Sequence, residues 1–263
     1  YGGTITDNTA TKGGGGVYVS GGTFTMNGNA SVSGNNATNG VSGGVYVVDG
    51  TFTMNGGTIS GNNASSTDGG VGVYTTDAST TATFTMNGGE ITRNKASSQG
   101  GGVGVYFAAK FEMNGGTISG NEVKGNGGGV YMDNKGVHMD GATFTMNYSA
   151  SVKDNTATNN GGGVYVESGT FDMNDGTISG NKAKNEKTSN DTNGGGVYVN
   201  KSGTFNMNDG TIGGMTVADA NTADTYGGGV FVNGGTFTID HGVISGHKAT
   251  NGGGGGFENR SAV

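Results

Sequence analysis

The sequence predicts an all-β protein, a three-sided parallel β-helix in which about eight successive coils stack into one solenoid. Three observations lead to this fold class. Three short motifs recur in a fixed order, each motif alternates apolar and polar side chains, and Gly supplies 60 of 263 residues, against a usual share of about 7%. One copy cannot bury its own apolar face, so we expect the copies to stack in register.

The first motif reads GGGVYV, and its alternation predicts a strand with Val facing the core and Tyr facing outward. Its copies are 25 to 34 residues apart, by subtraction of the Tyr numbers. That spacing is too short for the four antiparallel strands of a β-propeller blade, which need about 40 residues. The motif places its aromatic residues at Tyr18, Tyr46, Tyr74, Tyr106, Tyr131, Tyr165, Tyr198 and Phe231.

The second motif, GTFTMN, predicts a strand with Phe and Met inward and Thr outward. Stacked copies place Phe over Phe and Met over Met. The predicted Phe column consists of Phe24, Phe52, Phe84, Phe111, Phe144, Phe171, Phe205 and Phe237.

The third motif, GGTISGN followed by one residue and Ala, predicts a strand with Ile or Val inward. Asn closes both the second and the third motif, so the stacked copies should form two Asn ladders. The first column is Asn27, Asn55, Asn87, Asn114, Asn147, Asn174 and Asn208; the second is Asn8, Asn35, Asn62, Asn94, Asn121, Asn155 and Asn181. Runs of Gly before each first strand predict corners that need positive φ or close backbone approach.

Composition excludes several other classes of protein. There is no Cys for a disulfide scaffold or a thiolate metal site, and no Pro for a collagen helix. No apolar run reaches 18 residues, so we expect no transmembrane segment. The net charge of −7 argues against a nucleic-acid partner. Nothing in the sequence indicates a cofactor.

The three motifs, in this order, resemble the right-handed, pectin-lyase-like parallel β-helix repeats of large bacterial surface proteins of the adhesin type. The resemblance covers Gly2 to Phe257 and implies a right-handed coil, a cell-surface or extracellular location and a role as stalk or adhesive passenger. The chain enters and leaves in mid-repeat, so we expect residues 1–263 to be a single β-helix domain within a longer protein.

One departure from the repeat suggests a metal site. The register puts Asp175, Asp209 and His241 in one column, one side chain per coil. Carboxylates about 4.8 Å apart repel each other unless a proton or a cation such as calcium bridges them. The competing interpretation is ordinary Asp-Gly turn chemistry.

Two outward faces suggest binding. The seven tyrosines of the first motif could pack on sugar rings or on another protein, or could simply be covered by loops. The Thr-x-Thr pairs of the second motif resemble the flat arrays of ice-binding solenoids, although Lys110, Glu112, Asp172 and Asn206 interrupt them.

The functional expectation is a non-enzymatic extracellular rod on a bacterial surface, acting as stalk, adhesin or assembly module. Its expected partners are adjacent coils of a longer chain, further copies stacked end to end, or glycans and surface proteins. A polysaccharide-binding or polysaccharide-cleaving β-helix is the first alternative, and an ice-binding protein is the second. A polysaccharide lyase needs clustered acidic, basic and cationic side chains, and a chain with only two Arg and three His has few residues that could form such a cluster.

Overall fold

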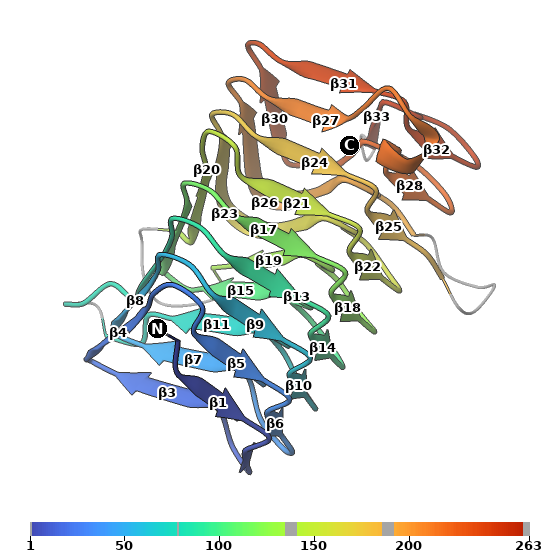
Figure 1. Ribbon diagram of the computed structural model, residues 1–263. Helices are drawn as coiled ribbons and strands as arrows, with labels where there is room; N and C mark the ends of the chain where they lie inside the picture. The colour runs from blue at the N-terminus through green and yellow to red at the C-terminus, as the bar shows by residue number, and fades with distance from the viewer. Residues whose placement is uncertain (1, 78, 135–140, 186–191, 260–263) are drawn as a thin grey trace.

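The computed structural model describes residues 2–77, 79–134, 141–185 and 192–259, and within them the chain winds into a solenoid of parallel strands (Figure 1). Strands of the same motif lie one above another from the N-terminal to the C-terminal end. The strands form two nine-stranded sheets and one fifteen-stranded sheet in the described part of the chain. The predicted all-β, three-sided parallel β-helix is therefore confirmed, while its right hand stays a prediction from the resemblance.

The fifteen-stranded sheet holds both the first and the second motif. The first motif forms the VYV strands β3 (Val17–Ser20), β7 (Val45–Val48), β11 (Val71–Tyr74), β15 (Val103–Tyr106), β19 (Val130–Asp133), β29 (Val230–Asn233) and β33 (Gly256–Asn259). The second motif forms the TFTM strands β4 (Thr23–Met26), β8 (Thr51–Met54), β12 (Thr83–Met86), β16 (Lys110–Met113), β20 (Thr143–Met146) and β30 (Thr236–Ile239). Two long strands, β23 (Val164–Met173) and β26 (Val197–Met207), run through both motifs and join the two sets.

The third motif forms two sheets, one more than the sequence predicted. The TIS strands are β1 (Thr4–Thr6), β5 (Ser31–Ser33), β9 (Thr58–Ser60), β13 (Glu90–Thr92), β17 (Thr117–Ser119), β21 (Ser151–Lys153), β24 (Thr177–Ser179), β27 (Thr211–Gly213) and β31 (Val243–Ser245). The residue-plus-Ala pairs form the short strands β2 (Thr9–Ala10), β6 (Asn36–Ala37), β10 (Asn63–Ala64), β14 (Lys95–Ala96), β18 (Glu122–Val123), β22 (Thr156–Ala157), β25 (Lys182–Ala183), β28 (Thr222–Ala223) and β32 (Lys248–Ala249).

The only helix in the described residues is the single-turn 3-10 helix η1 (Val217–Asp219). No described helix has the length and apolar character that crossing a bilayer requires.

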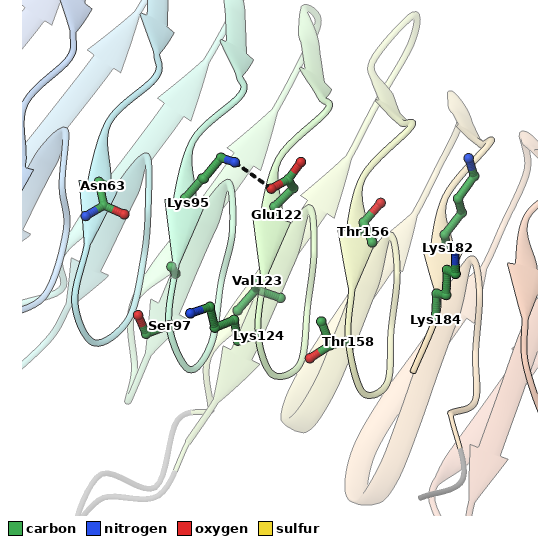
Figure 2. Close-up of a pocket in the computed structure, with 11 residues that line it drawn as sticks. Asn63, Lys95, Ser97, Glu122, Val123, Lys124, Thr156, Thr158, Lys182 and Lys184 are labelled. Atoms are coloured by element: carbon green, nitrogen blue, oxygen red, sulfur yellow. Dashed lines mark ion pairs between the residues drawn. The ribbon is translucent and has the colours of Figure 1, made fainter. Parts of the chain in front are cut away.

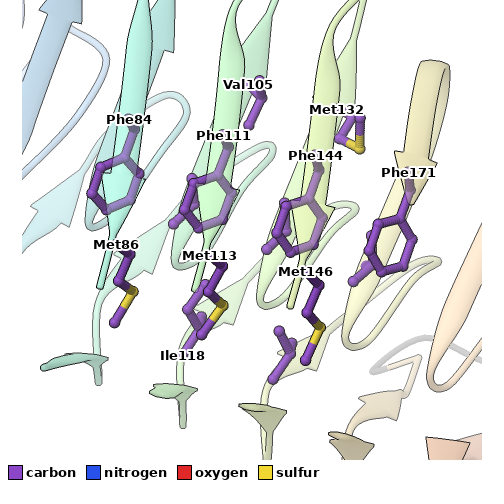
Figure 3. Packing of buried hydrophobic residues seen from close by; sticks show 14 of the residues in the cluster. Phe84, Met86, Val105, Phe111, Met113, Ile118, Met132, Phe144, Met146 and Phe171 are labelled. Carbon is purple, nitrogen blue, oxygen red and sulfur yellow. The ribbon is translucent and has the colours of Figure 1, made fainter. Parts of the chain in front are cut away.

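The core is a set of identical side chains stacked along the solenoid axis. Phe84 pairs in register with Phe111, and Ile91 pairs with Ile118, as the motif alignment predicts. Figure 3 shows the rings of Phe84, Phe111, Phe144 and Phe171 lying face to face, with Met below them. Their centroids are 4.7 Å apart, which is favourable stacking distance. Every coil thus completes the packing of its neighbours.

Both predicted Asn ladders are present, and they differ in burial. In the inner ladder, Asn94 donates from Nδ2 to Asn121 Oδ1 at 3.0 Å and to the Ile59 carbonyl at 3.0 Å. The backbone N–H of Asn94 also donates to Asn121 Oδ1, at 3.0 Å, so these buried amides are satisfied. The outer ladder, from Asn27 to Asn208, is mostly exposed and has amide–amide bonds of 2.7 to 3.1 Å.

The corner before each VYV strand has a left-handed backbone. Gly occupies it in most coils, for example Gly100 with φ 63° and Gly127 with φ 72°. Two coils depart from this rule, with Ser42 at φ 56° and Asp68 at φ 61°. Polar residues with short side chains tolerate this conformation better than others do, but they still adopt it at a cost.

Candidate functional site

The tyrosine face predicted from the sequence is largely closed to solvent. Tyr18 is 59% exposed and Tyr46 and Tyr74 are half-buried, but the remaining rings pack into a second cluster that is separate from the main core. The buried members are Tyr106, Tyr131, Tyr165, Tyr198 and Phe231. Burial raises the pKa of Tyr46 to about 12 and raises the pKa of Tyr131, Tyr165 and Tyr198 as well. Only the N-terminal part of this column offers ring surface to a ligand.

The column also departs from the predicted register at two places. Gly72 pairs with Tyr46, and Gly104 pairs with Tyr131, so neither Tyr74 nor Tyr106 occupies the expected position. These two tyrosines lie two residues further along their strands, because each copy reads VGVY. Their rings still join the stack, 4.3 Å apart and nearly parallel. The sequence-based alignment on Tyr was therefore wrong in these two coils.

The structure does not bring Asp175, Asp209 and His241 together as a metal-binding group. Asp175 Oδ1 accepts a hydrogen bond from the N–H of Gly176, and Asp209 Oδ1 accepts one from Gly210, both at 2.7 Å. All three side chains are exposed, and no group of three suitable ligands occurs in the part of the chain that the structure describes. The two carboxylates cap their own turns, as the turn interpretation expects, and the metal site stays a prediction.

The Thr-x-Thr face is in register but interrupted. Thr51 pairs with Thr23 and Thr83, and Thr53 pairs with Thr25 and Thr85. Lys110 and Glu112 then stand in the next strand, both exposed, and Asp172 and Asn206 interrupt the outward column in β23 and β26. A flat array of hydroxyls therefore extends over only three neighbouring strands, β4, β8 and β12.

A groove of about 590 Å³ runs along the short-strand sheet, where the sequence analysis had placed no site. Figure 2 shows that its lining residues come from successive coils, so the groove follows the solenoid axis. Its lining residues are Asn63, Lys95, Ala96, Ser97, Glu122, Val123, Lys124, Thr156, Thr158, Lys182 and Lys184. Four lysines and one glutamate give the groove a net charge of +3 in a chain of net charge −7.

The fold itself positions the groove's charges. Lys95, Glu122, Thr156 and Lys182 are register partners in β14, β18, β22 and β25. Lys95 Nζ and Glu122 Oε2 form an exposed ion pair of 2.8 Å, the dashed line in Figure 2. Within the described residues, Lys124, Lys182 and Lys184 form no ion pair. Three lysines thus keep their charge available to a ligand.

Comparison with known proteins gives no information on the fold or function of the chain. No protein-family model matches the chain, and neither a curated protein nor a solved structure matches it.

Proposed function

We propose that this chain is a non-enzymatic β-helix rod that acts as a stalk or spacer at a bacterial cell surface. The observation that carries the proposal is the uniform stack of phenylalanines from Phe24 to Phe237, with centroid separations of 4.6 to 5.1 Å. A stack without a break transmits force from one coil to the next, which is what a spacer requires. The resemblance to pectin-lyase-like adhesin repeats supports the same role and the extracellular location.

Rigidity can be tested with spin labels, because the chain has no native Cys. Cysteines at Thr25 and Thr238 would place labels on β4 and β30, at opposite ends of the TFTM column. Seven strand steps of about 4.8 Å separate these strands, so pulsed electron spin resonance should give a narrow distribution near 34 Å. A broad distribution would contradict a rigid spacer.

A spacer should also tolerate the loss of a whole coil. Deleting residues 83–109 joins Ala82 to Lys110, which is the register partner of Thr83. We expect the label distance to shorten by about 5 Å with little loss of cooperativity, because each coil contacts only its neighbours. Release of reducing ends from a panel of polysaccharides would instead show an enzyme, and we expect none.

The lysine-lined groove favours a second candidate function, binding of a linear anionic polysaccharide. Lysines come from the coils of β14, β18 and β25, whereas the coil of β22 contributes Thr156 and Thr158. Positive charge therefore recurs along the axis with one gap, which an extended polymer could span. Ser97, Thr156 and Thr158 add hydroxyl groups that can donate to and accept from sugar hydroxyls. None of the described residues that line the groove is aromatic, so they offer no ring on which a neutral sugar could stack.

Binding assays on immobilised polymers would test this candidate. We expect chondroitin sulfate or polygalacturonate to bind, neutral dextran not to bind, and affinity to fall as salt rises from about 50 to 300 mM, because salt screens exposed charges. Chondroitin sulfate carries both sulfate and carboxylate groups and polygalacturonate only carboxylates, so binding of both would show that carboxylates suffice, and binding of chondroitin sulfate alone would show that sulfate is needed. Equal binding of single-stranded poly(dT) would reveal a general attraction to polyanions and would contradict polysaccharide recognition.

Matched variants locate the interaction. Replacing Lys124, Lys182 and Lys184 with Gln removes three groove charges, and we expect at least tenfold weaker binding. The control replaces Lys110, Lys153 and Lys201, which are exposed on other parts of the solenoid. Both variants change net charge equally. If both weaken binding alike, the groove has no specific role.

A further inference from the structure

Asp68 is a carboxylate with no solvent exposure, at a corner where most coils have Gly. Its Oδ2 accepts a hydrogen bond of 2.7 Å from the Tyr74 hydroxyl and one of 3.2 Å from Thr67. Its Oδ1 accepts one of 2.9 Å from the Tyr106 hydroxyl. Tyr74 and Tyr106 belong to β11 and β15, so one carboxyl links the side chains of two successive coils.

The space for this carboxyl exists because two coils lack a side chain. A Cβ on Gly72 would lie 2.6 Å from Asp68 Oδ2, and a Cβ on Gly104 would overlap Asp68 Oδ1. These two glycines stand where the aromatic column otherwise has Tyr. Three departures from the repeat therefore fit together: Asp at the corner, Gly in the column, and Tyr moved two residues along.

No described residue places a positive charge beside this carboxylate. The titratable groups that face it are tyrosines: Tyr46 from β7, Tyr74 from β11, Tyr106 from β15 and Tyr131 from β19. Asp49 acts on Tyr46, and Asp133 and Glu167 act on Tyr131, so the charged groups around the cluster add negative charge. Among the described residues, no lysine, arginine or histidine influences the cluster. Burial, the largest cause, raises the pKa of Asp68 to about 7, although the hydroxyl donors oppose it.

A proton on Asp68 has a hydrogen-bond acceptor nearby, the hydroxyl of Ser42. The Ser42 hydroxyl is buried and has no hydrogen-bond partner, and it borders the same space above Gly72 as Asp68 Oδ2 does. This hydroxyl can accept a hydrogen bond from the protonated carboxyl, and it can also donate one to the ionised carboxylate, so it can serve either state. What favours the protonated state is the complete burial of a carboxylate beside which no described residue places a positive charge.

We propose that Asp68, with Tyr74, Tyr106 and Ser42, is a proton-controlled latch that holds the aromatic side of neighbouring coils together when protonated and loosens it when ionised. The direction of this pH effect on stability follows from the difference in proton affinity between the folded and the unfolded chain. Since the folded state holds the proton more tightly than the unfolded chain, whose Asp has its ordinary value of 3.8, the latch contributes fully below pH 4. Its contribution is lost as pH rises to about 7. Over this range the unfolding equilibrium constant rises by up to about tenfold per pH unit.

Carbon-13 NMR of Asp-labelled protein measures the titration directly. We expect one carboxyl with a midpoint near 7 that disappears in Asp68→Asn. Tyr106→Phe removes a donor to the carboxylate and should raise the midpoint, whereas Tyr198→Phe, in the same column without a contact to Asp68, should leave it unchanged. A wild-type midpoint below 5 would overturn the latch.

Denaturant unfolding at pH 5 and pH 8 tests its consequence. Asp68→Asn should lose less stability than the wild type over this range, and hydrogen exchange of β11 and β15 at pH 8 should be slower in the variant. Asp154→Asn is the matched control, because Asp154 has φ 56° but is exposed. Asp68→Gly restores the residue of the other coils and guards against a folding defect. Equal pH dependence in wild type and both Asp68 variants would refute the proposal.

Discussion

Phe171 shows what a single core residue contributes to a stacked fold. Its ring is fully buried, 4.7 Å from Phe144 and 4.7 Å from Phe205. Phe171→Ala should lower the free energy of unfolding by about 3 to 5 kcal/mol, because the cavity lies inside a continuous stack. Phe237→Ala is the control, since that ring is only half-buried and has one stacked neighbour, and it should cost less. Equal denaturation midpoints for wild type and Phe171→Ala would contradict the register.

His247 takes the place of Asn at the C-terminal end of the inner ladder. Its Nε2 lies 3.0 Å from the Ile212 carbonyl, and burial, the largest cause, lowers its pKa below the ordinary 6.5. The folded state therefore favours neutral His, so its contribution is present above pH 6.5 and is lost as pH falls below it.

His247→Asn should remove this acid sensitivity, because an amide does not titrate and the ladder already holds Asn at the equivalent position. The measurement is urea unfolding at pH 7.5 and pH 5. Wild type should lose more stability than the variant between the two values; the same loss in both would show that His247 is not the sensitive group.

At the scale of the element, the two Asn ladders should contribute differently to the free energy of unfolding. Asn121→Ala leaves buried groups of Asn94 without their acceptor and so should cost about 1 to 3 kcal/mol or more. Asn114→Ala, in the outer ladder, leaves groups that water can reach and should cost less than about 1 kcal/mol. Chemical denaturation of the matched pair decides the matter, and equal costs would contradict the role of burial.

The Asp-Gly turns give a second prediction at this scale. Asp175 and Asp209 already accept backbone hydrogen bonds, so calcium should not raise the melting temperature. Differential scanning calorimetry with calcium and with chelator measures this. A chelator-sensitive rise of several degrees that is absent in Asp209→Asn would establish the metal site.

Much of each element could be predicted from the sequence because equivalent residues of successive copies pair with each other, so aligning the copies predicts the register. Phe aligned on Phe gave the correct strand pairs, and Asn aligned on Asn gave both ladders. Asn221, the next rung after Asn181, was missed because an insertion before it hid the pattern. The N-x-Ala spacing of Asn221 and Ala223 could have located it.

The candidate sites were less predictable, for physical reasons. Alternation shows which way a Tyr points but not whether corner residues such as Gln99, which donates to the Tyr131 hydroxyl at 3.0 Å, will cover it. The VGVY copies alternate inward and outward residues just as GVYV does. The two-residue shift of Tyr74 and Tyr106 therefore does not change the period-two pattern and could not be detected from it. The groove depends on two-residue strands, which are too short to give a periodic signal.

At the scale of the whole molecule, each end of this solenoid exposes part of the core. Ile239 pairs with Met207 at an inward position, yet it is 49% exposed because no described strand stacks beyond β30. At the other end, Phe24 and Ile5 are only partly buried against the core. End strands also carry unpaired N–H and C=O groups, which favour pairing with another edge.

We therefore expect residues 1–263 to associate end to end as concentration rises, which light scattering after size exclusion would detect. Ile239→Lys places a charge on the end face and should suppress association. Val243→Lys is the matched control: Val243 is 53% exposed on the neighbouring strand, but it pairs with Thr211 at an outward position, on the side of the rod. Association through the end face predicts that only the first variant stays monomeric. A concentration-independent monomer in the wild type would mean that the exposed core at the ends does not drive assembly.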